Sequence, residues 1–309
     1  MTSHSGSPAI ETDGLAKQYG RVAALDGLTM TVRRGEVFGF LGPNGAGKTT
    51  AVKLLLGLAR PSAGRARVLG APIGNRQARA RIGYLPELFR YQPWLRAREV
   101  LALHCRLSRL PRDRWRAETD TALGLVGLAE RADDLVGTFS KGMQQRLGLG
   151  VALLGSPDLV VLDEPTSALD PVGRMDVRSI IRTARERGTT VFLNSHLLTE
   201  VERVCDRVAI IDRGRVLEEG RLDELLGDPA VRIRATNLSA SSVEALGRFG
   251  PVRIDGEWLT IEPLSPDRVP DVVESIVAAG GRIHAVDVGR SSLEDRFLGL
   301  LAQGSAPRS

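Results

Sequence analysis

The chain has 309 residues, of which 42% are hydrophobic and 26% charged, and its net charge at pH 7 is +5. These values predict a soluble globular protein with one large and one small domain, and they exclude a membrane-spanning chain because no apolar run reaches the ~18–20 residues that cross a bilayer. The positive charge does not predict nucleic-acid binding, because the arginines are interleaved with acidic and apolar residues and suit phosphate ligands or an anionic membrane surface equally well.

Residues 9–225 predict a large α/β domain, because apolar strands alternate with helices across short turns. The first clear strand, Glu36–Leu41, leads through a glycine-rich turn at Gly42–Gly47 into a helix at Lys48–Gly57. Later strands are predicted at Leu159–Leu162 and Thr189–Asn194, followed by a hairpin of Val208–Asp212 and Val216–Glu219.

A helical insertion is predicted within this domain, at residues of about 88–157. The segment has helical periodicity and little strand signal. Two helices are expected at Arg98–Arg109 and Trp115–Val126, and a third begins at Ser140, a favourable N-cap residue.

Residues 228–302 predict a small C-terminal accessory domain of the ferredoxin-like α+β type. Strands and helices follow in the order β-α-β-β-α-β, with a hairpin turn at Asp255-Gly256, and a final helix is expected at Ser292–Leu301. The two ends, residues 1–8 and 303–309, are expected to be disordered tails, and the first has no feature of a signal peptide.

The glycine-rich turn carries the strongest chemical motif. It fits the pattern G-x-x-x-x-G-K-[ST] between a strand and a helix with the residues Gly42, Pro43, Asn44, Gly45, Ala46, Gly47, Lys48 and Thr49, followed by Thr50. Backbone N–H groups of such a loop and the following helix N-terminus bind phosphate. Lys48 is expected to reach the β- and γ-phosphates of a nucleotide, and the Thr49 hydroxyl to bind Mg²⁺.

Two acidic residues end the buried strand at Leu159–Leu162. Asp163 is placed to hold Mg²⁺, and Glu164 to orient and deprotonate an attacking water. In isolation the pair could be two solvated acids in a loop, but a phosphate-binding loop in the same chain favours the catalytic interpretation.

With these motifs, residues 9–225 resemble the ATP-binding subunits of the ABC transporter family. Phe139–Arg146 resembles the family's signature motif, although in isolation Ser140–Arg146 could be an ordinary capped helix. Further positions that match are Ser140, Lys141 and Gly142 (signature), Asp170 (D-loop), His196 (switch histidine), Tyr19 (adenine-stacking aromatic) and Glu87 (Q-loop). Tyr19 either stacks on adenine or packs at the turn before Gly20.

Two departures from the family pattern point to a subgroup. Glu87 stands where Gln is most common, and its carboxylate can still bind Mg²⁺ or hold a water. Lys141 replaces the common Gly and either contacts an anion or faces solvent. The segment Ser-Lys-Gly-Met at 140–143 resembles that of bacterial ABC-2-type drug and multidrug exporters.

The resemblance implies a P-loop nucleotide-binding domain that uses ATP and Mg²⁺ and drives export through a separate integral membrane permease. It also implies that two such subunits, most simply a homodimer, enclose ATP between the loop of one and the signature motif of the other. The subunit would then be cytoplasmic, on the inner face of the cell membrane. The alternatives are an ABC ATPase that acts on nucleic acid or ribosomes, and a regulatory module that binds ATP without hydrolysing it; Glu164 and His196 argue against the second.

Overall fold

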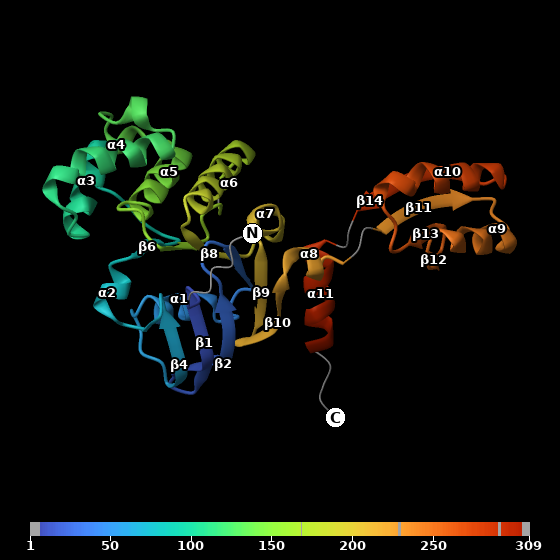
Figure 1. Cartoon of the computed structure of the whole chain (residues 1–309), viewed down its shortest axis with the longest axis horizontal. Helices are drawn as coiled ribbons and strands as arrows, with labels where there is room; N and C mark the ends of the chain where they lie inside the picture. The colour runs from blue at the N-terminus through green and yellow to red at the C-terminus, as the bar shows by residue number, and fades with distance from the viewer. Residues whose placement is uncertain (1–6, 168, 228–229, 290–291, 305–309) are drawn as a thin grey trace. The chain divides into compact units, whose positions relative to one another are not determined.

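The computed structural model describes residues 7–167, 169–227, 230–289 and 292–304, and the chain divides into two compact units, Met1–Leu222 and Asp223–Ser309 (Figure 1). The predicted disordered tails lie largely outside the described residues, although Gln303 and Gly304 still belong to the last helix. No helix in the described part of the chain has the length and apolar character needed to cross a membrane.

A six-stranded sheet forms the centre of the first unit. Its order is β10-β9-β3-β8-β7-β6, in which all neighbours are parallel except the hairpin of β9 and β10. The strands are β3 (Val37–Leu41), β6 (Ile82–Leu85), β7 (Leu159–Asp163), β8 (Thr190–Ser195), β9 (Arg207–Asp212) and β10 (Arg215–Arg221). Every residue of β3, β7 and β8 is buried, as expected for parallel strands covered on both faces.

A second, antiparallel sheet of order β2-β1-β4-β5 completes the unit. Its strands are β1 (Ile10–Tyr19), β2 (Val22–Val32), β4 (Ala63–Val68) and β5 (Ala71–Pro72). One hydrophobic core joins this sheet, helix α1 (Lys48–Leu55) and the parallel sheet, with Phe38, Phe40 and Phe192 fully buried in it. Phe38 and Phe40 belong to β3, so this core holds the strand that leads into the glycine-rich turn.

The helical insertion predicted after residue 88 is present, and its three helices lie together beyond the edge strand β6 (Figure 1). They are α3 (Ala97–Leu107), α4 (Trp115–Leu125) and α5 (Lys141–Ala152), with 3-10 turns at Arg112–Arg114, Ala129–Arg131 and Val136–Thr138. The other helices of the unit are α2 (Arg76–Arg79), α6 (Pro171–Glu186) and α7 (Leu198–Val204), and the short α8 (Leu222–Leu225) follows β10.

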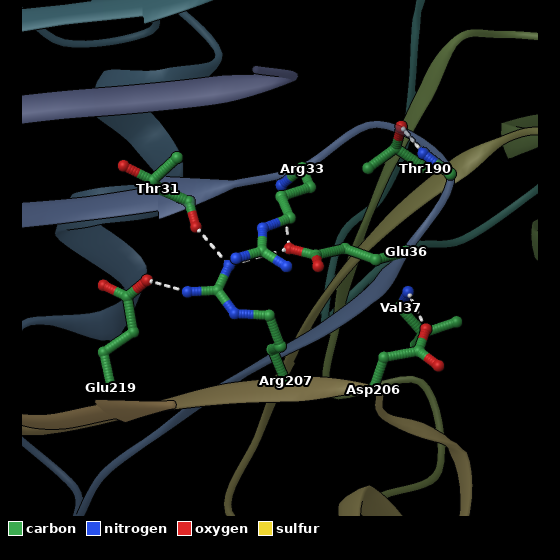
Figure 2. A network of polar contacts seen from close by, with 9 residues as sticks. Thr31, Arg33, Glu36, Val37, Thr190, Asp206, Arg207 and Glu219 are labelled. Carbon is green, nitrogen blue, oxygen red and sulfur yellow. Dashed lines mark hydrogen bonds and ion pairs between the residues drawn. The ribbon is translucent and has the colours of Figure 1, made fainter. Parts of the chain in front are cut away.

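A polar network at the start of β3 ties the two sheets together (Figure 2). The half-buried guanidinium of Arg207 donates to the Thr31 carbonyl at 2.9 Å, to Glu36 at 3.2 Å and to Glu219 at 2.6 Å. Burial raises the pKa of Glu36, while the Arg33 N–H and Arg207 lower it. The network fixes the first residues of β3, and through β3 the turn that follows.

The second unit has the element order β-α-β-β-α-β that the sequence predicts. Its antiparallel sheet has the order β12-β13-β11-β14, and alternate residues of β11 are buried against the helices. The elements are β11 (Ala230–Thr236), α9 (Ala240–Ala245), β12 (Val252–Asp255), β13 (Trp258–Ile261), α10 (Val269–Ala278), β14 (Arg282–Gly289) and α11 (Leu293–Gly304), with 3-10 turns at Leu246–Arg248 and Pro266–Arg268.

Candidate nucleotide-binding site

The glycine-rich turn sits where the carboxyl end of β3 meets the first turn of α1. Gly47 has a left-handed backbone with φ of +102°, and a Cβ there would lie 2.3 Å from the Ala24 carbonyl oxygen of β2. On its other side the turn accepts a hydrogen bond at Ala46 from the Gly214 N–H, at 2.9 Å. Only glycine suits position 47, and the turn is held between β2 and the β9–β10 hairpin.

A cavity of about 390 Å³ opens in front of this turn. Its lining combines the turn, the ends of three parallel strands and the start of β2, through Val22, Ala23, Ala24, Pro43, Asn44, Gly45, Gly47, Lys48, Thr49, Thr50, Glu87, Asp163, Glu164, Asn194 and His196. The structure thus brings most of the predicted nucleotide, Mg²⁺ and catalytic residues to one place, at the sheet edge where α/β proteins bind ligands.

Three predicted nucleotide-binding residues lie outside that lining. Gly42 and Ala46 form the back of the turn, where a Cβ at Gly42 would lie 2.4 Å from the Ile211 carbonyl and Ala46 is buried. Tyr19, at the end of β1, is half exposed, and the Lys17 ammonium lies 4.8 Å from its ring centre. Its strand partner, Val22, does line the cavity.

Lys48 points back into the turn. Its Nζ donates to the carbonyl of Gly42 at 2.6 Å and of Pro43 at 3.2 Å, and the residue is buried. Burial lowers the pKa of Lys48, and the negative charges of Glu164, Asp163 and Glu87 oppose that shift. The ammonium is therefore a desolvated donor that a phosphate group could draw out of these two carbonyls.

Asp163 ends β7 as a buried carboxylate beside Asn194 of β8. Burial raises the pKa of Asp163, and the hydrogen bond donated by the Asn194 amide lowers it. The other polar atom of that amide, Asn194 Oδ1, is buried and has no hydrogen-bond partner among the described residues. Thr49, Asp163 and Glu87 supply the hard oxygen ligands that Mg²⁺ prefers, so the residues present fit that ion.

Glu164 adopts a left-handed backbone, with φ of +52°. Its N–H donates to the Asn194 carbonyl at 2.9 Å, and its own carbonyl accepts from the N–H and hydroxyl of Ser167. Non-glycine residues in this region cost about 1–3 kcal/mol and concentrate at functional sites. The turn aims the Glu164 carboxylate into the cavity, at the end of the strand pair β7–β8.

His196 lies directly against Glu164. The Nδ1 atom of His196 is 2.8 Å from Oε2 of Glu164, and that oxygen has no other hydrogen-bond partner in the described part of the chain. Burial raises the pKa of Glu164, and the contact with His196 lowers it. Because the histidine is half exposed and the carboxylate buried, His196 forms the solvent-facing rim of the acidic site.

The predicted signature and D-loop residues lie apart from the cavity lining. Ser140 caps α5, its hydroxyl accepting from the Met143 N–H at 3.2 Å, and Lys141 is exposed. A Cβ at Gly142 would meet no atom of the described residues closer than the Ser140 hydroxyl, at 4.0 Å. Asp170 caps α6 by accepting from the Gly173 N–H at 2.9 Å.

Sequence reasoning missed Asn194, which orients Asp163 and borders the cavity. A signal for it was available, because Asn194 ends a predicted strand and parallel strand ends meet at one edge of a sheet. In the observed register Asn194 pairs with Asp163.

A phosphate-binding loop that faces two acidic strand-end residues and a histidine defines this chain as an ATPase of the P-loop class. A protein-family model described as ABC transporter matches residues 25–167. The daunorubicin resistance ATP-binding protein DrrA3 of Streptomyces coeruleorubidus is 38% identical, over 94% of this chain and 95% of that protein. The Nod factor export ATP-binding protein I of Paraburkholderia xenovorans is 41% identical, over 71% and 72% of the two chains.

A solved structure of the ATP-binding subunit of an ABC transporter, 30% identical, superposes with a TM-score of 0.64 over 70% of this chain and 91% of that one. The chain belongs to the ABC transporter family, as an ATP-binding subunit that couples ATP hydrolysis to transport. The resemblance and the α/β fold expected from the sequence are confirmed.

Proposed function

We propose that this chain hydrolyses ATP to power export of a substrate through a separate integral membrane permease. The observation that carries the proposal is the convergence of Lys48, Asp163, Glu164 and His196 on one cavity. The names of two relatives, daunorubicin resistance and Nod factor export, support outward transport. The relatives are ATP-binding subunits, so the path for the substrate belongs to another chain on the membrane, and this chain acts at its cytoplasmic face.

Each cavity residue has a role in this proposal. The N–H groups of the turn and the Lys48 ammonium bind the β- and γ-phosphates. Glu164 accepts a proton from the water that attacks the γ-phosphorus, as ADP departs on the opposite side. His196, at the rim, donates a hydrogen bond to the γ-phosphate and so distinguishes ATP from ADP.

Thr49, Asp163 and Glu87 are the residues that would hold Mg²⁺. When bound, the ion neutralises charge on the phosphate oxygens. The unpaired Asn194 Oδ1 and the buried Asp163 carboxylate support a ligand at this point, because buried polar atoms otherwise remain unsatisfied at a cost of about 1–3 kcal/mol.

A second copy of the subunit completes the site in this proposal. Ser140 and Gly142 begin the exposed end of α5, where backbone N–H groups can bind an anion. The open space at Gly142 indicates that packing inside its own chain does not require glycine there, which supports close approach by another molecule.

The permease contact is proposed at the loop between Glu87 and α3. This loop exposes two large apolar side chains, Leu88 at 87% and Trp94 at 70%, and such exposure typically marks a protein–protein contact. Because Leu88 follows Glu87 directly, a partner seated here would act on the edge of the nucleotide cavity. Nucleic acid is not among the partners that we propose.

Purification of the tagged chain from membranes of its native cell tests this function. An integral membrane protein is expected to co-purify and to raise the ATPase rate of the complex, and Leu88→Asp with Trp94→Asp should release it while ATP binding persists. Leu58→Asp, at an exposed leucine outside this loop, is the matched control. Recovery of ribosomes or nucleic acid in place of a membrane protein would refute the proposal.

A further inference from the structure

One face of α6 carries three arginines, at positions 178, 182 and 185, which lie on adjacent turns. All three reach the segment that follows His196. Arg178 contacts Glu200 of α7, Arg182 donates to the Arg203 carbonyl at the end of α7, and Arg185 pairs with Asp206 just beyond it. The C-terminal half of α6, the helix that Asp170 caps, is thus joined to the helix that follows the histidine.

The contact between Arg178 and Glu200 is the most buried of the three. Nη1 of Arg178 donates to both carboxylate oxygens of Glu200, at 2.9 and 2.7 Å, and the two side chains are 13% and 7% exposed. The side chain of Arg185 is 47% exposed, and exposed ion pairs are weak and screened by salt. Arg178 therefore supplies the contact that holds α7 most firmly.

The opposite side of α7 packs against the strand that leads into the phosphate-binding turn. A Cβ at Gly39 of β3 would lie 2.7 Å from Val201 and 3.1 Å from the sulfur of Cys205, so α7 touches the backbone of β3 directly. Beyond α7, Asp206 accepts a hydrogen bond from the Val37 N–H at 2.9 Å (Figure 2). Helix α7 is thereby clamped between β3 and α6.

His196 stands between two fixed points. Ser195 before it is buried at the end of β8, and its hydroxyl accepts from the Leu197 N–H at 3.0 Å. Helix α7 begins after it at Leu198, and the Glu200 N–H donates back to the Leu197 carbonyl. Because the histidine itself is half exposed and lies between β8 and α7 in the chain, we expect the position of α7 to influence where its ring lies relative to Glu164.

We infer that Arg178 and Glu200 form a positioning pair for His196, which couples α6 to the contact of the histidine with ATP. The inference rests on the proposed role of His196 at the γ-phosphate. Any displacement of Asp170 at the start of α6 then reaches His196 through Arg178. The subunit partner, which would lie at the D-loop, would in this way influence nucleotide sensing.

A purely stabilising role is the competing explanation, and the chemistry of buried ion pairs separates the two. Removal of one partner leaves a buried charge and destabilises a protein, whereas replacement of both by apolar residues of similar volume is commonly neutral or stabilising. An apolar pair fills the space but lacks directed hydrogen bonds, so it restores stability without fixing the angle of α7.

The test compares affinities for ADP and for the nonhydrolysable ATP analogue AMP-PNP by calorimetry on the full chain. Arg178→Met and Glu200→Gln should leave ADP affinity within about two-fold of wild type and lower the preference for AMP-PNP, and His196→Ala should lower the same preference. In the His196→Ala background, adding Arg178→Met should lower the preference for AMP-PNP by no more than a further factor of about two. The reason is that both changes remove the same interaction, that of His196 with the γ-phosphate. Turnover should fall on the order of 10–100-fold, as for a misplaced catalytic group.

The paired variant Arg178→Met with Glu200→Leu keeps the test valid if the single variants unfold. Its melting temperature should match wild type, while the preference for AMP-PNP stays low. Recovery of the preference together with stability would overturn the inference in favour of a structural role, as would an additive loss in the His196→Ala background. If His196→Ala itself leaves the preference unchanged, the proposed role of the histidine fails instead. Arg116→Met, at an arginine that is 94% exposed, is the control.

Discussion

Gly47 offers a direct test of how the phosphate-binding turn depends on its packing. In Gly47→Ala the new Cβ would lie 2.3 Å from the Ala24 carbonyl oxygen and 2.8 Å from Leu25 Cδ2, and the residue would have to keep a φ of +102°. A left-handed backbone costs an L-residue about 1–2 kcal/mol, and forced overpacking costs about 1–3 kcal/mol. The two effects together predict a loss of about 2–5 kcal/mol in the free energy of unfolding.

Gly74→Ala is the matched control for the backbone contribution. Gly74 also has a left-handed backbone, with φ of +86°, but no described atom lies within 4 Å of the position that a Cβ would take, and the residue is outside the cavity lining. The control should lose about 1–2 kcal/mol at most and keep wild-type affinity for ATP. The difference in unfolding free energy between the two variants therefore measures the cost of the clash with β2.

The assay combines urea unfolding with calorimetric titration of ATP. Gly47→Ala should bind ATP at least about ten-fold more weakly, which corresponds to a loss of about 1.4 kcal/mol of binding free energy. The reason is that the turn must shift to relieve the clash, and the shift misaligns the N–H groups that bind phosphate. If Gly47→Ala equals Gly74→Ala in both stability and ATP affinity, the turn is not fixed by β2 and this reasoning is wrong.

Four further predictions concern the acidic residues and the subunit contact. Glu164→Gln should lower turnover about 10²–10⁴-fold while ATP affinity is retained, and Glu244→Gln, at an exposed glutamate, is the control. A Glu164→Gln rate within about ten-fold of wild type would exclude Glu164 as the base. Because burial raises the pKa of Glu164, activity should fall as the pH drops through that raised pKa, at higher pH than an exposed glutamate would give. Burial also raises the pKa of Asp163, so its charge opposes folding increasingly as the pH rises above the ordinary carboxyl pKa of about 4. In thermal unfolding, Asp163→Asn should therefore stabilise the nucleotide-free protein more at pH 7 than at pH 4. Greater stabilisation at pH 4 would show that the pKa of Asp163 is not raised. Turnover per subunit should rise with protein concentration in a dilution series, and a constant specific activity would argue against a site shared between two copies.

The glycine-rich turn of the proposed nucleotide site was predictable from sequence because its pattern is local. Gly42–Thr50 places its glycines, Lys48 and Thr49 within one stretch of chain, between a strand and a helix that each have a clear apolar pattern. The antiparallel sheet of the first unit, β2-β1-β4-β5, was not predicted. Bulges interrupt the pairing of its strands β1 and β2 and break the two-residue alternation that identifies strands.

Helix α6 was also missed, although its signals are local. Asp170 followed by Pro171 is a helix-start pattern, and the buried residues Val177, Ile180, Ile181 and Ala184 have helical spacing. Asn194 differs in kind. Its relation to Asp163, 31 residues earlier, depends on which parallel strands are neighbours, and the pattern within either strand does not contain that information.

Two glycines of the proposed site differ in what their surroundings demand, and the difference bears on how the site is assembled. At Gly47 a side chain would collide with the backbone of the same chain, so the fold alone accounts for glycine there. At Gly142 a Cβ would meet nothing in the described residues closer than 4.0 Å, and the residue lies in the first turn of α5, where glycine costs helix stability of roughly 1 kcal/mol relative to alanine. Under the proposal of a site shared between two subunits, close approach of a phosphate group held by the other subunit accounts for a glycine that the described fold neither needs nor favours. Gly142→Ala should therefore leave the monomer as stable as wild type or more so while it lowers turnover, and a variant with unchanged turnover would remove the signature motif from the active site.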